Sequence, residues 1–95
     1  MFLKSASAFI WPGGTIVLPK NSKRADYETD LGVMIGRGAK SVQESEALEY
    51  VFGYTIVLDM SIRDEEFASI VLRKLYDTSA PIALCITKRD EIVDP

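Results

Sequence analysis

The chain contains no histidine, a single cysteine and no long hydrophobic run, and each absence excludes a class of function. Without histidine, its 95 residues supply neither His-based acid–base chemistry nor a His-containing zinc site. Cys85 alone excludes an intrachain disulfide and fits a reducing compartment; because its neighbours are apolar, we expect a buried, inert thiol. The longest apolar stretches, around 54–58 and 81–87, have the length of strands rather than of membrane-spanning helices.

An excess of positive charge is also absent. The chain has 11 Lys and Arg against 14 Asp and Glu, a net charge of −3, and its basic residues are scattered. We therefore expect no nucleic-acid partner and no membrane partner. The composition is ordinary for a globular protein, and 95 residues suffice for one small core. We expect a single domain over residues 1–95, located in the cytoplasm, or in mitochondria if the source is a eukaryote.

The hydrophobic pattern predicts an α+β domain that is mainly β. Five apolar or alternating segments predict strands: 2–10, 15–18, 25–35, 54–60 and 82–87. So many short strands leave unpaired edges, which favour pairing with a partner chain, with a second copy or with further sequence.

One main helix is predicted at about 42–52. Ser41 followed by Glu44 fits a capping box, and Gly53 fits a left-handed cap at the other end. Apolar residues at helical spacing predict a second, short helix after Arg63.

Three carboxylates are candidates for chemistry. Glu28 and Asp30 are two residues apart in an extended segment, so their side chains share a face, and Asp59 ends a buried-looking strand. Carboxylates brought together stay ionised only with a positive group among them, and a divalent cation with oxygen ligands is the usual one. The alternatives are a solvated strand face for the first two acids, and an ion pair with Arg63 or a helix N-cap for Asp59.

Two basic residues near these acids have two interpretations each. Arg63 is either a surface residue or a positive fork suited to a substrate carboxylate. Lys74 lies in an apolar stretch, where it is either a helix-surface lysine that extends to solvent or a group that stabilises developing oxyanion charge.

The sequence resembles the fumarylacetoacetate hydrolase (FAH) family, which includes fumarylacetoacetase, acylpyruvases, oxaloacetate decarboxylases and the isomerase/decarboxylases of homoprotocatechuate degradation. Five segments follow one another in the family's order: Phe2–Ser5, Asp26–Arg37, Glu46–Thr55, Leu58–Asp64 and Lys74–Thr78. Each segment is a modest motif, but the ordered set is specific. The resemblance implies a partial FAH-type mixed β-roll, the N-terminal half of the family's catalytic domain.

The resemblance also implies a site. By similarity, the ligands of a divalent metal, usually Mg²⁺ with Mn²⁺ or Ca²⁺ as alternatives, are Glu28, Asp30 and Asp59. Arg63 and Lys74 are implied as catalytic residues, and both contact the substrate together with Glu66. The implied activity is hydrolysis or decarboxylation, with C–C bond cleavage, of a small anionic β-dicarbonyl or 2-oxo acid such as an acylpyruvate, fumarylacetoacetate or oxaloacetate.

Several departures from the family pattern leave the activity of these residues open. Asp30 replaces a usual Glu, Glu66 replaces a frequent Gln, and the stretch between Arg63 and Lys74 is short. The family's water-activating His-Glu pair and the downstream half of its fold lie outside the matched segments. We therefore consider two hypotheses: a Mg²⁺-dependent hydrolase, decarboxylase or isomerase that forms a homodimer, and a truncated non-catalytic module that pairs with itself or with another FAH-family chain.

Overall fold

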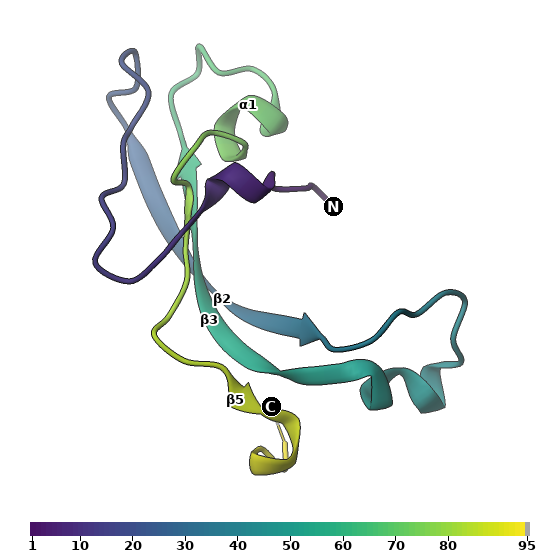
Figure 1. Cartoon of the computed structure of the whole chain (residues 1–95). Helices are drawn as coiled ribbons and strands as arrows, with labels where there is room; N and C mark the ends of the chain where they lie inside the picture. The colour runs from purple at the N-terminus through teal and green to yellow at the C-terminus, as the bar shows by residue number, and fades with distance from the viewer. Residues whose placement is uncertain (95) are drawn as a thin grey trace.

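The computed structural model describes residues 1–94, and two long antiparallel strands dominate it (Figure 1). Strand β2 (Ala25–Ile35) has the predicted boundaries. Strand β3 (Val51–Ile62) extends the predicted strand at both ends, and Val51 pairs with Ile35. The two strands curve together through most of the molecule. The mainly β character with little helix confirms the predicted fold class.

Strand β3 is the centre of a three-stranded sheet of order β2-β3-β5, in which β5 (Thr87–Lys88) is short. A second, parallel pair joins β1 (Phe9–Ile10) to β4 (Ala80–Pro81). The predicted strands at 2–10 and 82–87 are therefore reduced to short pairings, and residues 15–18 form no strand.

The short helix predicted after Arg63 is present as α1 (Ile70–Lys74). Its N-cap is Ser69, whose side chain accepts a hydrogen bond from the backbone N–H of Val71. Among the described residues, no helix is long and apolar enough to cross a membrane.

The main helix predicted at 42–52 is wrong. This segment forms the 3₁₀ helix η2 (Glu44–Tyr50) and then enters β3. Ser41 has a φ of 52°, and the N-cap residue is Gln43, whose side chain makes no capping hydrogen bond. No residue of η2 is buried, and a short α-helix without a packed face is marginal in water. The sequence contains the capping pattern of Ser41 and Glu44, but the apolar side of the predicted helix is buried against no other element within the described chain. A longer α-helix therefore does not form here.

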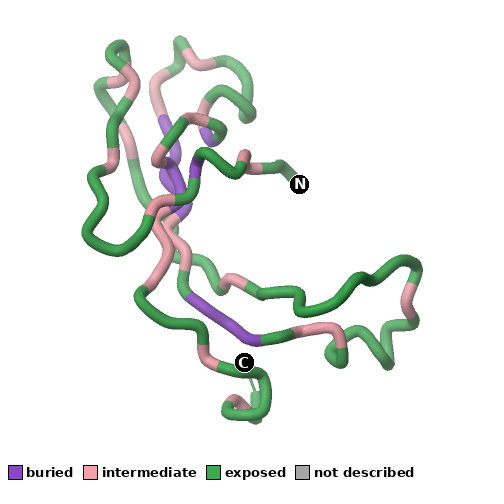
Figure 2. Tube along the Cα trace, in the orientation of Figure 1, coloured by how far each residue is buried: buried purple, intermediate pink, exposed green. Residues whose placement is uncertain are grey.

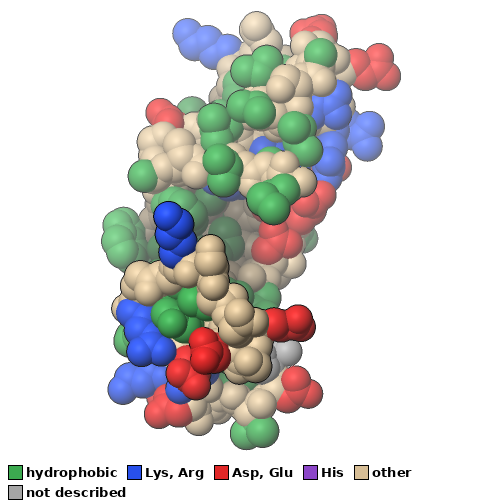
Figure 3. Space-filling model, turned by 90° about the vertical axis from the view of Figure 1, so that its right-hand side faces the viewer, with side chains coloured by type: hydrophobic (Ala, Val, Ile, Leu, Met, Phe, Trp, Pro, Cys, Tyr) green, Lys and Arg blue, Asp and Glu red, His purple; other side chains and the backbone are tan. Residues whose placement is uncertain are grey.

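The core lies around the C-terminal half of β3. Figure 2 shows buried residues where the N-terminal segment and the chain after α1 cross that strand. Ala8, Ile62 and Ala80 are fully buried there. Strand β2, in contrast, is an edge strand whose apolar residues are exposed; Tyr27 is 69% exposed and Ile35 62% exposed. Figure 3 shows hydrophobic side chains gathered around a hollow on the adjoining side of the molecule.

Candidate functional site

One face of the β2–β3 pair carries the acidic residues. The register places Glu28 opposite Asp59 and Asp30 opposite Val57. Opposite residues of paired strands share a face, and every second residue along a strand returns to it. Glu28, Asp30 and Asp59 therefore lie on the same face of the sheet.

Lys74 joins two of these carboxylates. Its Nζ lies 3.1 Å from Glu28 Oε2 and hydrogen-bonds to Asp59 Oδ2. Lys74 and Asp59 are buried, at 7% and 3% exposure. Burial alone lowers the pKa of Lys74, but the hydrogen bonds to Asp59 and Glu28 outweigh it and raise that pKa above its ordinary value, so the ammonium stays charged. Of the two interpretations of Lys74, the structure supports a buried positive group rather than a surface lysine.

Arg63 lies on the outer side of this cluster. Its Nη2 is 2.5 Å from Glu28 Oε1, and its Nε is 3.3 Å from Asp26 Oδ2. The hydrogen bond from Arg63, and then that from Lys74, lowers the pKa of the Glu28 carboxyl. Arg63 thus pairs with Glu28 and Asp26 and not with Asp59, for which an ion pair with Arg63 was one of the alternatives. The cations nearest Asp59 are two lysines.

The second of these lysines is Lys4, which sequence reasoning did not single out as a site residue. Its Nζ lies 2.8 Å from Asp59 Oδ1, and its side chain is 10% exposed. Two signals in the sequence could have pointed to it: Lys4 follows the apolar residues Phe2 and Leu3, and it lies in Phe2–Ser5, the first of the five segments that carry the family resemblance.

Two other predicted site residues lie apart from the cluster. Asp30 and Glu66 are exposed, and within residues 1–94 neither side chain has an ion pair or hydrogen bond. In the same described part of the chain, no three His, Cys, Asp or Glu side chains converge closely enough to hold a metal ion. The structure therefore brings together Glu28, Asp59, Arg63 and Lys74, and leaves Asp30 on the same face but separate.

Asp64, next to Arg63, holds the loop that precedes β2. Its carboxylate accepts hydrogen bonds from the backbone N–H groups of Lys23 and Arg24 and from the Ser22 hydroxyl. Partial burial opposes ionisation, but these donors, led by Arg24, outweigh it and lower the pKa of Asp64. Asp64 is therefore a structural acid that joins the end of β3 to the loop before β2.

The chemistry of the three candidate carboxylates, although not their spacing, suits a hard divalent cation. Glu28, Asp59 and Asp30 offer carboxylate oxygens from one sheet face, and such oxygens are the ligands that Mg²⁺ and Mn²⁺ take in proteins. Asp59 Oδ1 is buried and accepts no hydrogen bond within the described chain, although the Lys4 ammonium is close. A cation-binding role would account for an acid kept so deeply buried.

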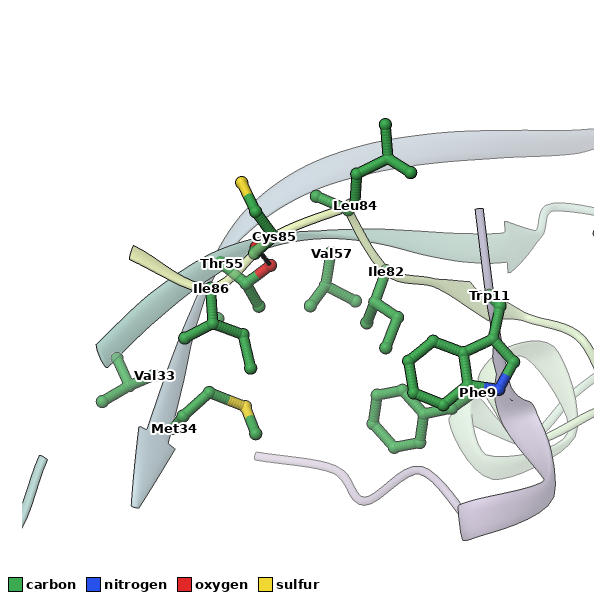
Figure 4. A pocket seen from close by; sticks show the side chains of 12 residues that line it. Phe9, Trp11, Val33, Met34, Thr55, Val57, Ile82, Leu84, Cys85 and Ile86 are labelled. Carbon is green, nitrogen blue, oxygen red and sulfur yellow. Dashed lines mark hydrogen bonds between the residues drawn. The ribbon is translucent and has the colours of Figure 1, made fainter. Parts of the chain in front are cut away.

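An apolar cavity of about 480 Å³ continues along this face past Gly32 and Val57. Figure 4 shows the side chains of Phe9, Val57 and Ile82 pointing into it, whereas that of Cys85 points away. Cys85 is exposed, so the expected buried thiol is wrong. The segment around Cys85 meets β3 only through isolated contacts, such as the hydrogen bond from Thr55 Oγ1 to the Cys85 carbonyl.

Comparisons with a family model, with protein sequences and with solved structures all relate this chain to one family. The family model described as "Fumarylacetoacetate (FAA) hydrolase C-terminal" matches residues 1–95. An uncharacterized protein of Pyrococcus horikoshii is 42% identical over 101 residues, covering 100% of this chain. The mitochondrial oxaloacetate tautomerase Fahd2a of Rattus norvegicus is 33% identical over 98 residues, also covering 100% of this chain.

Among solved structures, the maleylpyruvate hydrolase from Sphingobium sp. SYK-6, in complex with manganese(II) and pyruvate, superposes with a TM-score of 0.85 at 35% identity. The match covers 99% of this chain. The chain spans 44% of the length of the Pyrococcus relative, 31% of the rat relative and 34% of the Sphingobium chain.

Proposed function

Because this chain belongs to the fumarylacetoacetate hydrolase family, we propose that it forms part of a divalent-metal-dependent enzyme that acts on a small oxo acid. The proposed reaction is hydrolysis or decarboxylation, with C–C bond cleavage, of a β-dicarbonyl or 2-oxo acid such as an acylpyruvate, fumarylacetoacetate or oxaloacetate. The manganese and pyruvate named for the Sphingobium hydrolase support a divalent metal and an oxo-acid ligand. Magnesium is our proposal for the resident metal.

The observation that carries this proposal is the buried Lys74 ammonium between Glu28 and Asp59. Burial of the Lys74 ammonium and the Asp59 carboxylate beside β3 carries a desolvation cost that apolar packing alone would not carry. Charged groups of this kind cluster where a protein binds or transforms a ligand.

The proposed roles follow from position. Glu28, Asp30 and Asp59 would hold the metal, which when bound supplies Lewis-acid stabilisation of negative charge on a substrate oxygen. Arg63, one-third exposed beside Glu28, would bind and orient a substrate carboxylate through its fork of N–H donors. Lys74 would stabilise oxyanion charge, since its ammonium is charged and shielded from water.

Glu66 has a different proposed role. It lies in the exposed loop between Arg63 and α1, so it would face the entrance used by the substrate. A carboxylate there would disfavour substrates with a second negative charge at that end.

The test is an assay of the isolated protein with oxaloacetate and with acetylpyruvate, with and without Mg²⁺ or Mn²⁺, monitored by loss of the enol absorbance and by release of products. We expect metal-dependent turnover that is lost in Asp59→Asn, with Asp77→Asn as an exposed control. Equal rates for wild type and Asp59→Asn would contradict the proposal. The tautomerase name of the rat relative adds one arm, the enol-to-keto conversion of oxaloacetate, in which the enol hydroxyl loses a proton and the neighbouring carbon gains one.

A second candidate function is a non-catalytic module that associates with itself, as a homodimer, or with a longer chain of the family. The observation that favours it is the exposed apolar side of the edge strand β2, with Tyr27, Leu31 and Ile35 each more than half exposed. Sedimentation equilibrium tests it together with the enol assay: a dimer that Ile35→Lys dissociates and that has no metal-dependent turnover would support this function, and a monomer at high concentration would contradict it. The mitochondrial name of the rat relative supports mitochondria as the compartment if the source is a eukaryote, with the cytoplasm proposed otherwise.

A further inference from the structure

The ammonium of Lys4 lies within a shell of four oxygen atoms. Its Nζ donates to the Lys74 carbonyl at 2.7 Å, to Ser79 Oγ at 3.0 Å and to the Ser79 carbonyl at 3.1 Å, and lies 2.8 Å from Asp59 Oδ1. An ammonium has three hydrogens to donate, and the first three oxygens use them all. Asp59 therefore receives charge from Lys4 rather than a well-aligned hydrogen bond, in agreement with the lack of a hydrogen bond at its Oδ1.

Through these contacts Lys4 touches both Asp59 and Lys74, which form an ion pair with each other. Lys4 neutralises Oδ1 of Asp59, while Lys74 binds Oδ2 of the same carboxylate. Lys4 also holds the backbone carbonyl of Lys74 itself, from a position 70 residues earlier in the chain. The Ser79 hydroxyl donates to that same carbonyl, so the end of α1 is fixed from two sides.

We propose that Lys4 is a positioning residue that fixes the Lys74 ammonium and the Asp59 carboxylate relative to each other. Without Lys4, the Lys74 carbonyl keeps only the Ser79 hydroxyl among these partners, and Asp59 Oδ1 keeps no charged partner within residues 1–94. The carboxylate is then free to rotate, and the last turn of α1 is free to shift. An arginine does not replace Lys4, because its planar fork does not fit a shell of oxygens around one point.

The first test measures this geometry directly and involves no metal. Heteronuclear NMR of isotope-labelled lysine side chains detects ammonium groups whose protons exchange slowly with water. We expect two such signals, from Lys4 and Lys74, because the other lysines are exposed: Lys20, Lys23, Lys40 and Lys88. In Lys4→Met, which keeps an unbranched apolar stem as far as Cε and lacks the ammonium, the Lys74 signal should also disappear.

Controls separate this effect from general unfolding. Lys40→Met removes an exposed lysine and should leave both signals in place. Ser79→Ala removes one acceptor from Lys4 without removing a charge, and should weaken both signals even if Lys4→Met does not fold. A Lys74 signal that is unchanged in both Lys4→Met and Ser79→Ala would overturn the proposal.

The second test uses Mn²⁺ affinity and rests on the proposed function. Removing a nearby positive charge by itself would tighten binding of Mn²⁺ to Asp59, whereas loss of a group that orients a metal ligand weakens it by about 10–100-fold. We expect the weakening in Lys4→Met, and in Lys4→Ala we expect added propylammonium, but not butanol, to restore affinity. Tighter binding in Lys4→Met would overturn the positioning role. Absence of Mn²⁺ binding by the wild type would contradict the proposed function and leave the NMR result standing.

Discussion

Glu28 and Asp59 face each other across the β2–β3 pair, and one ammonium, that of Lys74, contacts both carboxylates. Two acids directly opposite each other in an antiparallel pair destabilise it unless a cation lies between them. The protein supplies that cation from α1, which follows β3 in the chain and places Lys74 46 residues after Glu28. The packing of α1 against the strands therefore keeps these two acids together.

Replacing Lys74 separates its structural role from its proposed chemical role. In Lys74→Met we expect Mn²⁺ affinity to rise, because the ammonium no longer competes for Glu28 and Asp59, and turnover of oxo acid to be lost. Titration calorimetry and the enol assay measure the two quantities. Lys88→Met, which removes an exposed lysine, should alter neither. Unchanged turnover in Lys74→Met would rule out a catalytic role for this residue.

Arg63→Met should affect ligand binding more than folding. The side chain is one-third exposed and its pairs with Glu28 and Asp26 are accessible to solvent, and surface ion pairs contribute little to stability. We expect a nearly unchanged melting temperature and a KM for oxo acid raised by roughly tenfold or more, the loss of one charge-assisted contact. A large fall in melting temperature with an unchanged KM would assign Arg63 to folding alone.

Removing the buried acid should cost stability in the metal-free protein. Asp59→Ala leaves Lys4 and Lys74 close together without their shared carboxylate. Breaking a buried pair by removal of one partner typically costs about 3 kcal/mol or more, which is our expectation for the free energy of unfolding in urea. Asp30→Ala is the matched control, since Asp30 is exposed on the same face. If the free energy of unfolding falls by the same amount in both variants, the buried ion pairs of Asp59 are not a source of stability.

Asp64 predicts a pH dependence of stability. Its pKa is lower in the folded chain than its ordinary value of 3.8, because the Arg24 and Lys23 N–H groups and the Ser22 hydroxyl outweigh the effect of burial. The unfolded state therefore binds more protons in this range, so the stabilisation is present above about pH 3.8 and is lost as the pH falls through the lowered pKa. Urea titrations at a series of acidic pH values should show this loss, and Asp64→Asn should reduce it. An equally steep loss in Asp64→Asn would assign the acid sensitivity to other groups.

Gly53 should be intolerant of a side chain. A Cβ added at Gly53 would lie 2.3 Å from the Thr87 carbonyl oxygen, a backbone atom of the strand that pairs with β3. Gly53→Ala should therefore separate β5 from β3 and increase amide hydrogen exchange around residues 87–88. At Gly38 an added Cβ meets open space, so Gly38→Ala should not change that exchange. Similar protection of β5 in wild type and Gly53→Ala would contradict the close approach.

The sequence predicts the two long strands, because their hydrophobic pattern can be read from the strand residues alone. Strand β2 was found at its predicted boundaries because polar and apolar residues alternate through it. Strand β3 was predicted over residues 54–60 because that stretch is mostly apolar, and the structure extends it at both ends. The segment around η2 carried an equally clear local signal, the capping box at Ser41 and Glu44. That signal failed because helix formation depends on burying a face, and η2 buries none.

The candidate site is less accessible to sequence reasoning because its contacts join distant parts of the chain. Glu28 and Asp59 could be named from the sequence as candidate site residues, but the position of Lys74 between them follows only from the packing of α1. The contacts of Lys4 could not be predicted, since its four oxygen neighbours come from residues 59, 74 and 79. The exposure of Tyr27 and Ile35 likewise depends on what packs against β2, which alternation alone does not reveal.

The most direct test of the central claim is titration of the purified protein with Mn²⁺ by calorimetry, in wild type, Glu28→Ala and Lys40→Met. If the acidic face around Glu28 and Asp59 holds a divalent metal, wild type and Lys40→Met bind one Mn²⁺ with equal affinity and Glu28→Ala does not bind it. Equal heats of binding in all three proteins, or none in the wild type, would contradict a metal site on this face.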